Sequence, residues 1–233
     1  MMLDFGQFDC LSFDCYGTLI DWESGILGYL GPLLRNKGVS VTNNEILNLY
    51  SEFEPRQQRQ GYRSYREVLA AVVRDYAAHF RFAVSGEEAN GLAESIRGWQ
   101  PFPDTVPALQ QLKKRYKLAV LSNIDDDLFA FTAPKLGVEF DCVVTAQQVQ
   151  SYKPSLRNFE ALLQRIPVEK SRLLHVAESL YHDVAPAHSL GIATVWVNRR
   201  QNKPAGATRL VEAAADVEVA TVGALADAAA TVR

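Results

Sequence analysis

The sequence predicts an α/β fold in which a mostly parallel sheet carries helices on both faces, with a small helical cap added to it. Short apolar runs without polar alternation recur along the chain, which is typical of strands that are buried on both faces. Helical patterns separate these runs, as they do in βαβ units. Residues 20–98 contain helical patterns alone, so we expect them to form an inserted cap.

The apolar runs define the expected core. Its strands are predicted at 10–13, 116–121, 140–145, 173–177, 192–197 and 217–219. Its helices are predicted at 105–114, 125–136, 155–166, 181–190 and 222–231. Residues 1–19 and 99–233 therefore form the α/β core, and the two prolines in 99–103 mark the return of the chain from the cap.

The cap, residues 20–98, is predicted to contain four helices, at 26–34, 44–54, 65–80 and 87–98. Thr42, Ser64 and Ser85 lie just before three of these segments, where a hydroxyl can accept a hydrogen bond from a free backbone N–H group. We expect this cap to lie over the carboxyl edge of the sheet.

The composition excludes several classes of protein. The 233 residues carry a net charge of −3, without the clustered basic face that nucleic-acid binding needs. No apolar stretch reaches the length of about 18 residues that a membrane span requires, and the N-terminal residues lack the basic region of a signal peptide. The three cysteines, without a CxxC pair, are typical of free thiols in a reducing compartment, so we expect a cytoplasmic protein.

Polar residues that can do chemistry follow the predicted strands in order. They are Asp14 and Thr18, then Ser122 and Asn123, then Lys153, then Glu178 and Asp183. In an open parallel sheet these positions meet at one edge, where ligands bind. Each residue also has a simpler explanation, such as a helix cap, a turn former or a surface charge. Together and in this order, they favour a nucleophile, a hydroxyl and amide pair, a lysine and a carboxylate pair at one site.

This order resembles that of the haloacid dehalogenase-like hydrolase superfamily. The matching segments are DCYGT (14–18), LSN (121–123), YKP (152–154) and ES (178–179) with Asp183. The resemblance covers the whole chain and implies a Rossmann-like core with a small cap. Most members are Mg²⁺ phosphatases with a second aspartate two residues after the nucleophile, where this chain has Tyr16. Because a halide leaves without needing a proton, Tyr16 is compatible with dehalogenation, and the chain looks like an L-2-haloacid dehalogenase.

The resemblance implies a mechanism without a required cofactor. Asp14 attacks C2 of a small carboxylic acid and forms an ester, which water then hydrolyses. Lys153 keeps Asp14 ionised, Thr18 hydrogen-bonds in the same cluster, and Asp183 holds Lys153 or the water. Ser122 completes the expected catalytic set. The substrate is expected to contact the following residues: Cys15, Tyr16, Asn123, Glu178 and Trp22. Trp22 alternatively packs the cap onto the core.

Three departures from the branch keep other functions open. The arginine that is thought to receive the halide aligns with Ser51, although Arg35, Arg56 or Arg59 can replace it. A tyrosine six residues beyond the lysine is Phe159, and Glu178 stands where dehalogenases often have serine. One alternative is a Mg²⁺-dependent phosphatase in which Asp14, Glu178 and Asp183 bind the metal. Another is a metal-free hydrolase of a strained-ring amino acid.

A binding protein on an inactive hydrolase scaffold is a further alternative, which the intact set of site residues disfavours. The four histidines lack metal-ligand spacing, and His182 is expected on a helix surface rather than in the site. The expected partner is a small carboxylate substrate, with no nucleic acid and no membrane. Members of this branch are often dimers, so a homodimer is one expectation.

Overall fold

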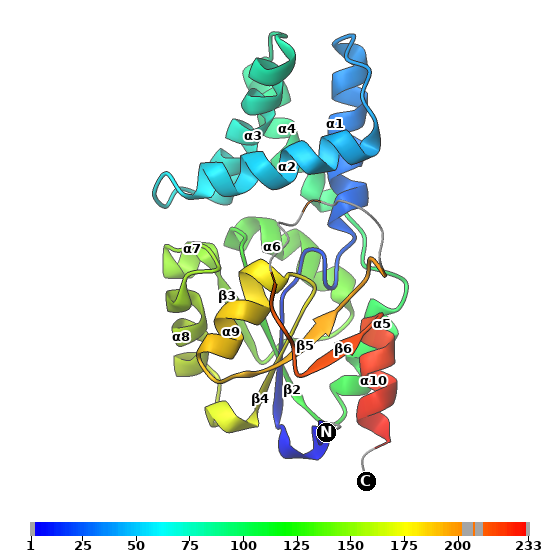
Figure 1. Ribbon diagram of the computed structural model, residues 1–233, viewed down its shortest axis with the longest axis vertical. Helices are drawn as coiled ribbons and strands as arrows, with labels where there is room; N and C mark the ends of the chain where they lie inside the picture. Colours follow the sequence, from blue (N-terminus) through cyan, green and yellow to red (C-terminus); the bar gives the residue numbers. More distant parts are fainter. Residues whose placement is uncertain (1–2, 202–206, 208–211, 232–233) are drawn as a thin grey trace.

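The core is a six-stranded parallel sheet, in the order β3-β2-β1-β4-β5-β6. The computed structural model describes residues 3–201, 207 and 212–231. The central strand β1 (Cys10–Phe13) pairs with β2 (Lys117–Ser122) and β4 (Leu173–Ala177), while β3 (Cys142–Thr145), β5 (Ala193–Val197) and β6 (Val217–Val219) extend the sheet (Figure 1). The predicted parallel α/β fold is therefore confirmed.

Alternate side chains of the strands enter two apolar layers, one on each face of the sheet. Leu11, Phe13 and Val120 belong to the layer that also holds Leu109 and Leu225. These two leucines come from α5 (Thr105–Leu112) and α10 (Val222–Ala230). The opposite layer holds Cys10 and Leu121 together with side chains of α8 (Leu156–Arg165) and α9 (Ala185–Ser189). Both faces are covered, which explains why the strands lack polar alternation.

Two predicted core helices are divided in the structure. The segment expected at 125–136 is α6 (Asp126–Thr132) followed by a 3-10 turn, Ala133–Leu136. The segment expected at 181–190 is a π-helical turn, η5 (Leu180–Val184), followed by α9. A further short helix, α7 (Ala146–Val149), follows β3 directly. Other 3-10 turns lie at Phe5–Gln7, Ile96–Gly98 and Lys170–Arg172.

Four helices between β1 and β2 form the cap above the carboxyl ends of the strands (Figure 1). They are α1 (Trp22–Asn36), α2 (Asn43–Gln58), α3 (Tyr65–Phe80) and α4 (Gly86–Ser95). The hydroxyls of Thr42, Ser64 and Ser85 accept hydrogen bonds from the backbone N–H groups three residues later, and a glutamate completes a capping box at each. The three predicted N-caps are confirmed.

The chain enters and leaves the cap at the same place. Asp21 N–H donates to the carbonyl of Gln100 at 2.9 Å, and Ile20 forms a bridge with Pro101. The division into a core of 1–19 and 99–233 and a cap of 20–98 stays a prediction, and this crossing supports it.

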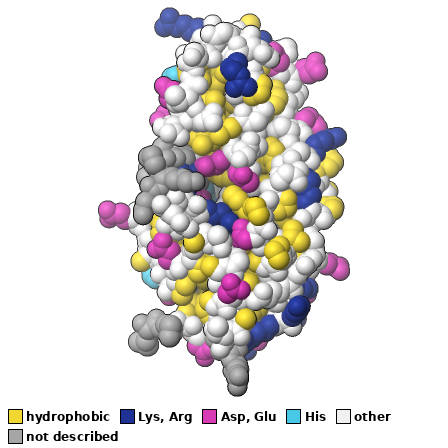
Figure 2. Space-filling view, turned by 90° about the vertical axis from the view of Figure 1, so that its right-hand side faces the viewer, with side chains coloured by type: hydrophobic (Ala, Val, Ile, Leu, Met, Phe, Trp, Pro, Cys, Tyr) yellow, Lys and Arg dark blue, Asp and Glu magenta, His cyan; other side chains and the backbone are white. Residues whose placement is uncertain are grey.

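On the face drawn in Figure 2, Lys and Arg side chains are scattered among acidic ones. Of the helices that the structure describes, none has both the length and the apolar character of a membrane span.

Candidate active site

Asp14 follows the central strand directly, so it lies at the middle of the carboxyl edge. Its side chain is buried, and its Oδ2 accepts a hydrogen bond from the Thr18 hydroxyl at 2.7 Å. The backbone N–H of Glu178 in turn donates to Thr18 Oγ1 at 2.9 Å. Gly17 makes the tight turn between them with a φ of +100°, which favours glycine. The loop after β1 and the loop after β4 thus fix one oxygen of Asp14.

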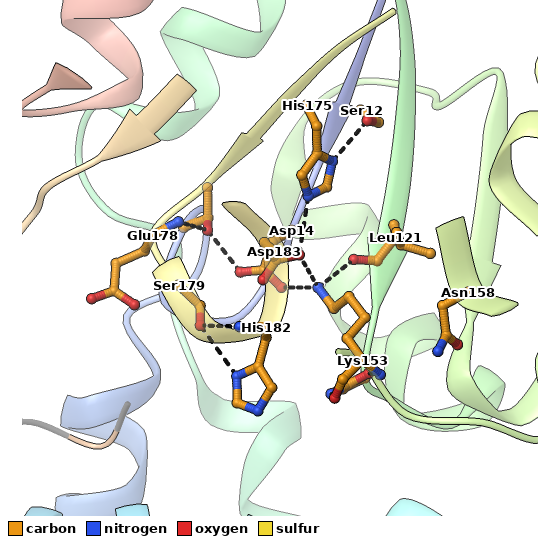
Figure 3. Close-up of polar contacts among 12 residues, drawn as sticks. Ser12, Asp14, Leu121, Lys153, Asn158, His175, Glu178, Ser179, His182 and Asp183 are labelled. Atoms are coloured by element: carbon orange, nitrogen blue, oxygen red, sulfur yellow. Dashed lines mark hydrogen bonds and ion pairs between the residues drawn. The ribbon is translucent and has the colours of Figure 1, made fainter. Parts of the chain in front are cut away.

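Lys153 places its ammonium between two carboxylates (Figure 3). Its Nζ lies 2.8 Å from Asp14 Oδ1, 2.6 Å from Asp183 Oδ1 and 2.9 Å from the carbonyl oxygen of Leu121. A lysine ammonium has three N–H donors, and these three acceptors use all of them. With only 2% of its side chain exposed, Lys153 is held in one position against the nucleophile candidate.

A buried histidine supports this ion-pair network from behind (Figure 3). His175 on β4 lies with its Nε2 3.0 Å from Asp183 Oδ1 and its Nδ1 2.8 Å from the Ser12 hydroxyl. Phe159 packs edge-on against the His175 ring, at the position where the branch carries tyrosine. His175 therefore orients Asp183, a role that the sequence analysis missed because the histidine lies within an apolar strand.

The electrostatics of the three charged groups follow from burial and attraction. Burial alone would lower the pKa of Lys153, but attraction to the two aspartates outweighs it and raises that pKa. Burial alone would raise the pKa of Asp183, but Lys153 and His175 hold it below its ordinary value. For Asp14, burial raises the pKa, and the attraction of Lys153 opposes that rise. Lys153 is thus a fixed cation at neutral pH.

A pocket of about 40 Å³ opens above Asp14 and Lys153, between the core and the cap. This volume holds only a few water molecules, so the ligand it fits is small. Of the ten predicted site residues, eight line this pocket: Asp14, Tyr16, Trp22, Ser122, Asn123, Lys153, Glu178 and Asp183. The other two lie behind it, because Thr18 contacts Asp14 from the core and the Cys15 side chain is fully buried. A side-chain contact of Cys15 with substrate does not fit this placement.

Two of the lining residues, Asn123 and Tyr16, form hydrogen bonds with other groups of the protein. The side-chain amide of Asn123 accepts from Lys153 N–H at 2.7 Å and donates to the Lys153 carbonyl at 3.1 Å, so it positions the lysine loop. The Tyr16 hydroxyl lies 2.8 Å from that of Thr132. Trp22 lines the pocket and also packs edge-on against Tyr50 of α2, and its contact with substrate stays a prediction.

Within the part of the chain that the structure describes, three buried polar atoms of the pocket residues lack a hydrogen-bond partner. They are Ser122 Oγ, Asp183 Oδ2 and His182 Nε2. Buried polar atoms are normally paired, so their hydrogen-bonding capacity is available to a ligand or to water. Ser122 Oγ suits a substrate carboxylate, and Asp183 Oδ2 suits a water molecule.

Four further side chains line the pocket that the sequence analysis did not place there: Glu54, Tyr65, Ser179 and His182. The prediction of a surface position for His182 is wrong, because the π-helical turn η5 directs its ring inward, where it lies beside the Ser179 hydroxyl. Burial lowers the pKa of His182 to about 4, so it is neutral at pH 7. Glu54 and Tyr65 come from α2 and α3 of the cap, and no motif marked them.

The arginine of the branch has no counterpart in the described lining of this pocket. Ser51, at the aligned position, donates to the carbonyl of Asn48 within α2. Arg56 pairs with Asp75 at 2.9 Å, and Arg35 is an exposed residue of α1. Arg59 lines a neighbouring pocket together with Tyr181. The cap instead contributes an acid, Glu54, to the active-site pocket.

The side chains present do not fit a magnesium site of the kind that the phosphatase alternative needs. Asp14 and Asp183 direct their Oδ1 atoms at the same lysine ammonium, and Glu178 lies 3.4 Å from Arg200. Among the described residues, no three His, Cys, Asp or Glu side chains are grouped so that they could hold a metal ion. Lys153 thus takes the position between the carboxylates that a cation would need.

Comparison with known proteins identifies the family. A model of the haloacid dehalogenase-like hydrolases matches residues 8–191. The chain belongs to the haloacid dehalogenase-like hydrolases. It is 30% identical over 193 residues to (S)-2-haloacid dehalogenase 2 of Pseudomonas sp. (strain CBS-3), with 82% of this chain and 83% of the relative covered. It is also 31% identical over 159 residues to the glyceraldehyde 3-phosphate phosphatase of Methanothermobacter thermautotrophicus, with 62% of this chain and 70% of the relative covered.

A solved structure shows the same fold. The L-2-haloacid dehalogenase of Xanthobacter autotrophicus with covalently bound chloropropionic acid superimposes with a TM-score of 0.79, at 17% identity, over 97% of this chain and all of the other. The expectation that the chain is a hydrolase of the haloacid dehalogenase type, in the L-2-haloacid dehalogenase branch, is confirmed.

Proposed function

We propose that this haloacid dehalogenase-like hydrolase displaces a substituent at C2 of a small carboxylic acid through an ester on Asp14. The observation that carries the proposal is the Asp14–Lys153–Asp183 cluster, in which the ammonium lies within 2.8 Å of both carboxylates. This cluster holds an anionic nucleophile without a metal ion. The covalent chloropropionic acid adduct of the structurally similar Xanthobacter enzyme supports this assignment.

The reaction then proceeds in two steps. An oxygen of Asp14 attacks C2, a C–O bond forms, and the bond from C2 to the substituent breaks with its electron pair going to the leaving group. Water next attacks the carbonyl carbon of the Asp14 ester, and the bond from that carbon to the substrate oxygen breaks. The product is a 2-hydroxy acid, and the oxygen of the water stays in the Asp14 carboxylate.

The unpaired atoms of the pocket supply the remaining roles. Ser122 Oγ donates to the substrate carboxylate, together with backbone amides near Cys15 and Tyr16, as the sequence predicts. Asp183 Oδ2 accepts a hydrogen bond from the attacking water, since Lys153 and His175 bind only its Oδ1. Lys153 stabilises the anionic Asp14 before the attack and after its release.

Two other reactions compete with this proposal. The phosphatase relative and the acid Glu178 favour phosphate-ester cleavage, which the lysine-filled cluster and Tyr16 disfavour. Opening of a strained-ring amino acid uses the same Asp14 ester, and it suits a pocket whose described lining includes no arginine. This second reaction is a variant of the proposal, with nitrogen as the leaving atom.

A substrate panel tests the proposal directly. L-2-Chloropropionate, L-2-bromopropionate, azetidine-2-carboxylate and p-nitrophenyl phosphate are each incubated with Mg²⁺ and with EDTA. We expect turnover of at least one C2-substituted acid, unaffected by EDTA and lost by at least about 10⁴-fold in Asp14→Asn. Phosphate release that EDTA abolishes would instead support the phosphatase, and tight ligand binding without any turnover would support a binding protein.

Isotope labelling separates the ester mechanism from direct attack by water. In a single turnover in ¹⁸O-water, we expect the label in the Asp14 carboxylate, measured by mass spectrometry of the peptide that contains it. Label in the 2-hydroxy acid alone would contradict the ester mechanism even if the substrate class is right.

The proposal also covers the cellular compartment and the oligomeric state of the enzyme. The three cysteines, Cys10, Cys15 and Cys142, are free thiols, which suits the expected cytoplasmic location. A homodimer stays a prediction, and size-exclusion chromatography with light scattering tests it.

A further inference from the structure

The cap wall of the pocket is the side toward which a leaving group departs. Displacement at carbon requires the leaving atom to lie opposite the attacking oxygen, and Asp14 attacks from the core. Three cap side chains line the pocket: Trp22, Glu54 and Tyr65. Figure 1 shows α2, which carries Glu54, crossing above the carboxyl ends of the strands. The departing substituent therefore meets an indole, a phenol and a carboxyl group.

Glu54 is unusual among these groups because it is an acid that is 94% buried, with only 6% of its surface exposed. Its Oε1 accepts hydrogen bonds from Gln58 Nε2 and, at 3.4 Å, from the Tyr65 hydroxyl. These neighbours are uncharged donors, and the charged pairs among the described residues do not include Glu54. A buried carboxyl without a cation takes up a proton.

Burial raises the pKa of Glu54 to about 8, with the Tyr65 hydrogen bond acting in the opposite direction. Because Oε1 already accepts two hydrogen bonds, the proton is favoured on Oε2. At neutral pH the cap wall thus presents a neutral carboxylic acid. An ionised glutamate would repel a departing anion, whereas a protonated one donates to it.

We propose that Glu54 is the hydrogen-bond and proton donor to the leaving group, and that the enzyme therefore accepts 2-substituents that leave through oxygen or fluorine, not only the heavier halides. This inference rests on the proposed Asp14 ester mechanism. In the first step the bond from C2 to the substituent breaks and the leaving atom keeps the electron pair. Glu54 gives its proton to a leaving oxygen, whereas it donates a hydrogen bond to a leaving fluoride, which departs as the anion. In the second step the water that hydrolyses the ester releases one proton, which restores Glu54 where Glu54 has given up its own. The sum is substrate plus water giving a 2-hydroxy acid and either the protonated oxygen leaving group or fluoride and a proton.

The other titratable groups around the pocket change charge well away from pH 8 or lie outside the leaving-group side. Those nearest Glu54 are Tyr50 and Tyr65 of the cap and Tyr152 of the core, and burial raises the pKa of each above its usual value. The others of the core are Asp14, Tyr16, Lys153, Glu178, His182 and Asp183. Lys153 has a raised pKa and His182 a pKa of about 4, so neither titrates near Glu54.

The test compares leaving groups in one set of proteins. We measure kcat/KM between pH 6 and 10 for L-2-bromopropionate and L-2-fluoropropionate, with the wild type, Glu54→Gln and Glu52→Gln. Glu52 is an exposed residue of the same helix and serves as the matched control. We expect Glu54→Gln to lose about 100-fold with the fluoro substrate and less than 3-fold with the bromo substrate, because bromide needs no donor.

The pH profile gives a second readout that does not depend on the folding of the variant. In the wild type, turnover of the fluoro substrate falls as pH rises through about 8, while turnover of the bromo substrate does not. A loss in Glu54→Gln that is equal for both substrates, or no loss, would overturn the assignment of Glu54. Wild-type turnover of the bromo substrate alone would also overturn it. Failure with both substrates, and with the other C2-substituted acids of the substrate panel, would contradict the proposed function itself.

Discussion

The two sides of the active-site pocket, the core edge and the cap wall, carry different kinds of polar group. At the core edge, the charged side chains pair with one another: Asp14, Lys153 and Asp183. Most of the other hydrogen bonds of these three go to Thr18, Leu121 and His175. At the cap wall, one acid lies among aromatic rings and an amide, and burial keeps it protonated at neutral pH. The core therefore holds fixed charges, whereas the cap offers a proton that can be transferred.

This contrast teaches which wall determines which part of the reaction. A nucleophile must be an anion before the substrate arrives, so it needs a cation in place. A leaving group becomes basic only as its bond breaks, so it needs a donor that stays neutral until then. The core arrangement serves any substrate that Asp14 attacks. The proposed choice of leaving group is then a property of the cap, which contributes Glu54 to the pocket, whereas the described lining includes no arginine.

Removal of the central cation has the largest expected effect and breaks the core side of the comparison. In Lys153→Met, Asp14 and Asp183 become two buried, unpaired carboxylates. Loss of one partner of a buried ion pair typically costs about 3–5 kcal/mol. We expect that loss in the free energy of unfolding by urea, together with a fall in kcat of at least about 100-fold.

A matched control and a double variant sharpen this result. Lys114→Met removes an exposed lysine of the core and is expected to change the free energy of unfolding by less than about 0.5 kcal/mol. Lys153→Met combined with Asp183→Asn is expected to lose less than the sum of the single changes, because one of the unpaired charges is gone. Strict additivity would show that the two side chains do not interact as the 2.6 Å contact indicates.

Titration of the cap acid has the next largest effect. The pKa of Glu54 is raised from 4.5 to about 8 in the folded protein. Below pH 4.5 both states carry the proton. As pH rises, the unfolded state releases its proton first, so the stability contributed by the protonated form is lost up to about pH 8. We expect the wild type to lose up to about 3 kcal/mol relative to Glu54→Gln between pH 4.5 and 7.

Urea unfolding at several pH values measures this difference. Glu52→Gln, on the exposed face of α2, is expected to run parallel to the wild type. A constant difference between Glu54→Gln and the wild type across this pH range would mean that Glu54 is ionised in the fold. The cap wall would then carry a charge, and the contrast with the core would disappear.

The same contrast explains how much the sequence could predict. The core site was predictable because Asp14, Ser122, Lys153 and Asp183 each follow a strand or its loop, and parallel strands share one edge. Glu54 was not, because its position depends on how α2 lies over that edge, which helical periodicity does not encode. His182 was misplaced because a regular helix was expected, whereas a π-helical turn rotates its side chain into the pocket. His175 was missed because its neighbours are apolar.

Ser122 tests substrate binding at the core edge with a smaller effect. Its hydroxyl is buried and, among the described residues, has no partner, so Ser122→Ala removes no hydrogen bond from the free protein. We expect an unchanged or slightly higher free energy of unfolding, and a KM that rises about 10-fold because one hydrogen bond to the substrate carboxylate is lost. Steady-state kinetics and urea unfolding measure the two. Ser189→Ala, away from the pocket, is the control, and a fall in kcat with an unchanged KM would contradict a binding role.

Tyr16 has the smallest expected effect, although it stands where phosphatases carry their second acid. Its hydroxyl lies 2.8 Å from Thr132 Oγ1, and its ring packs edge-on against Trp99. Tyr16→Phe leaves the buried Thr132 hydroxyl without this partner, which costs about 1–2 kcal/mol in the free energy of unfolding. The kcat should change less than 3-fold, because the phenol is directed at Thr132 rather than at the leaving group. A 30-fold fall in kcat that is confined to the fluoro substrate would assign the donor role to Tyr16, so the core rather than the cap would supply it.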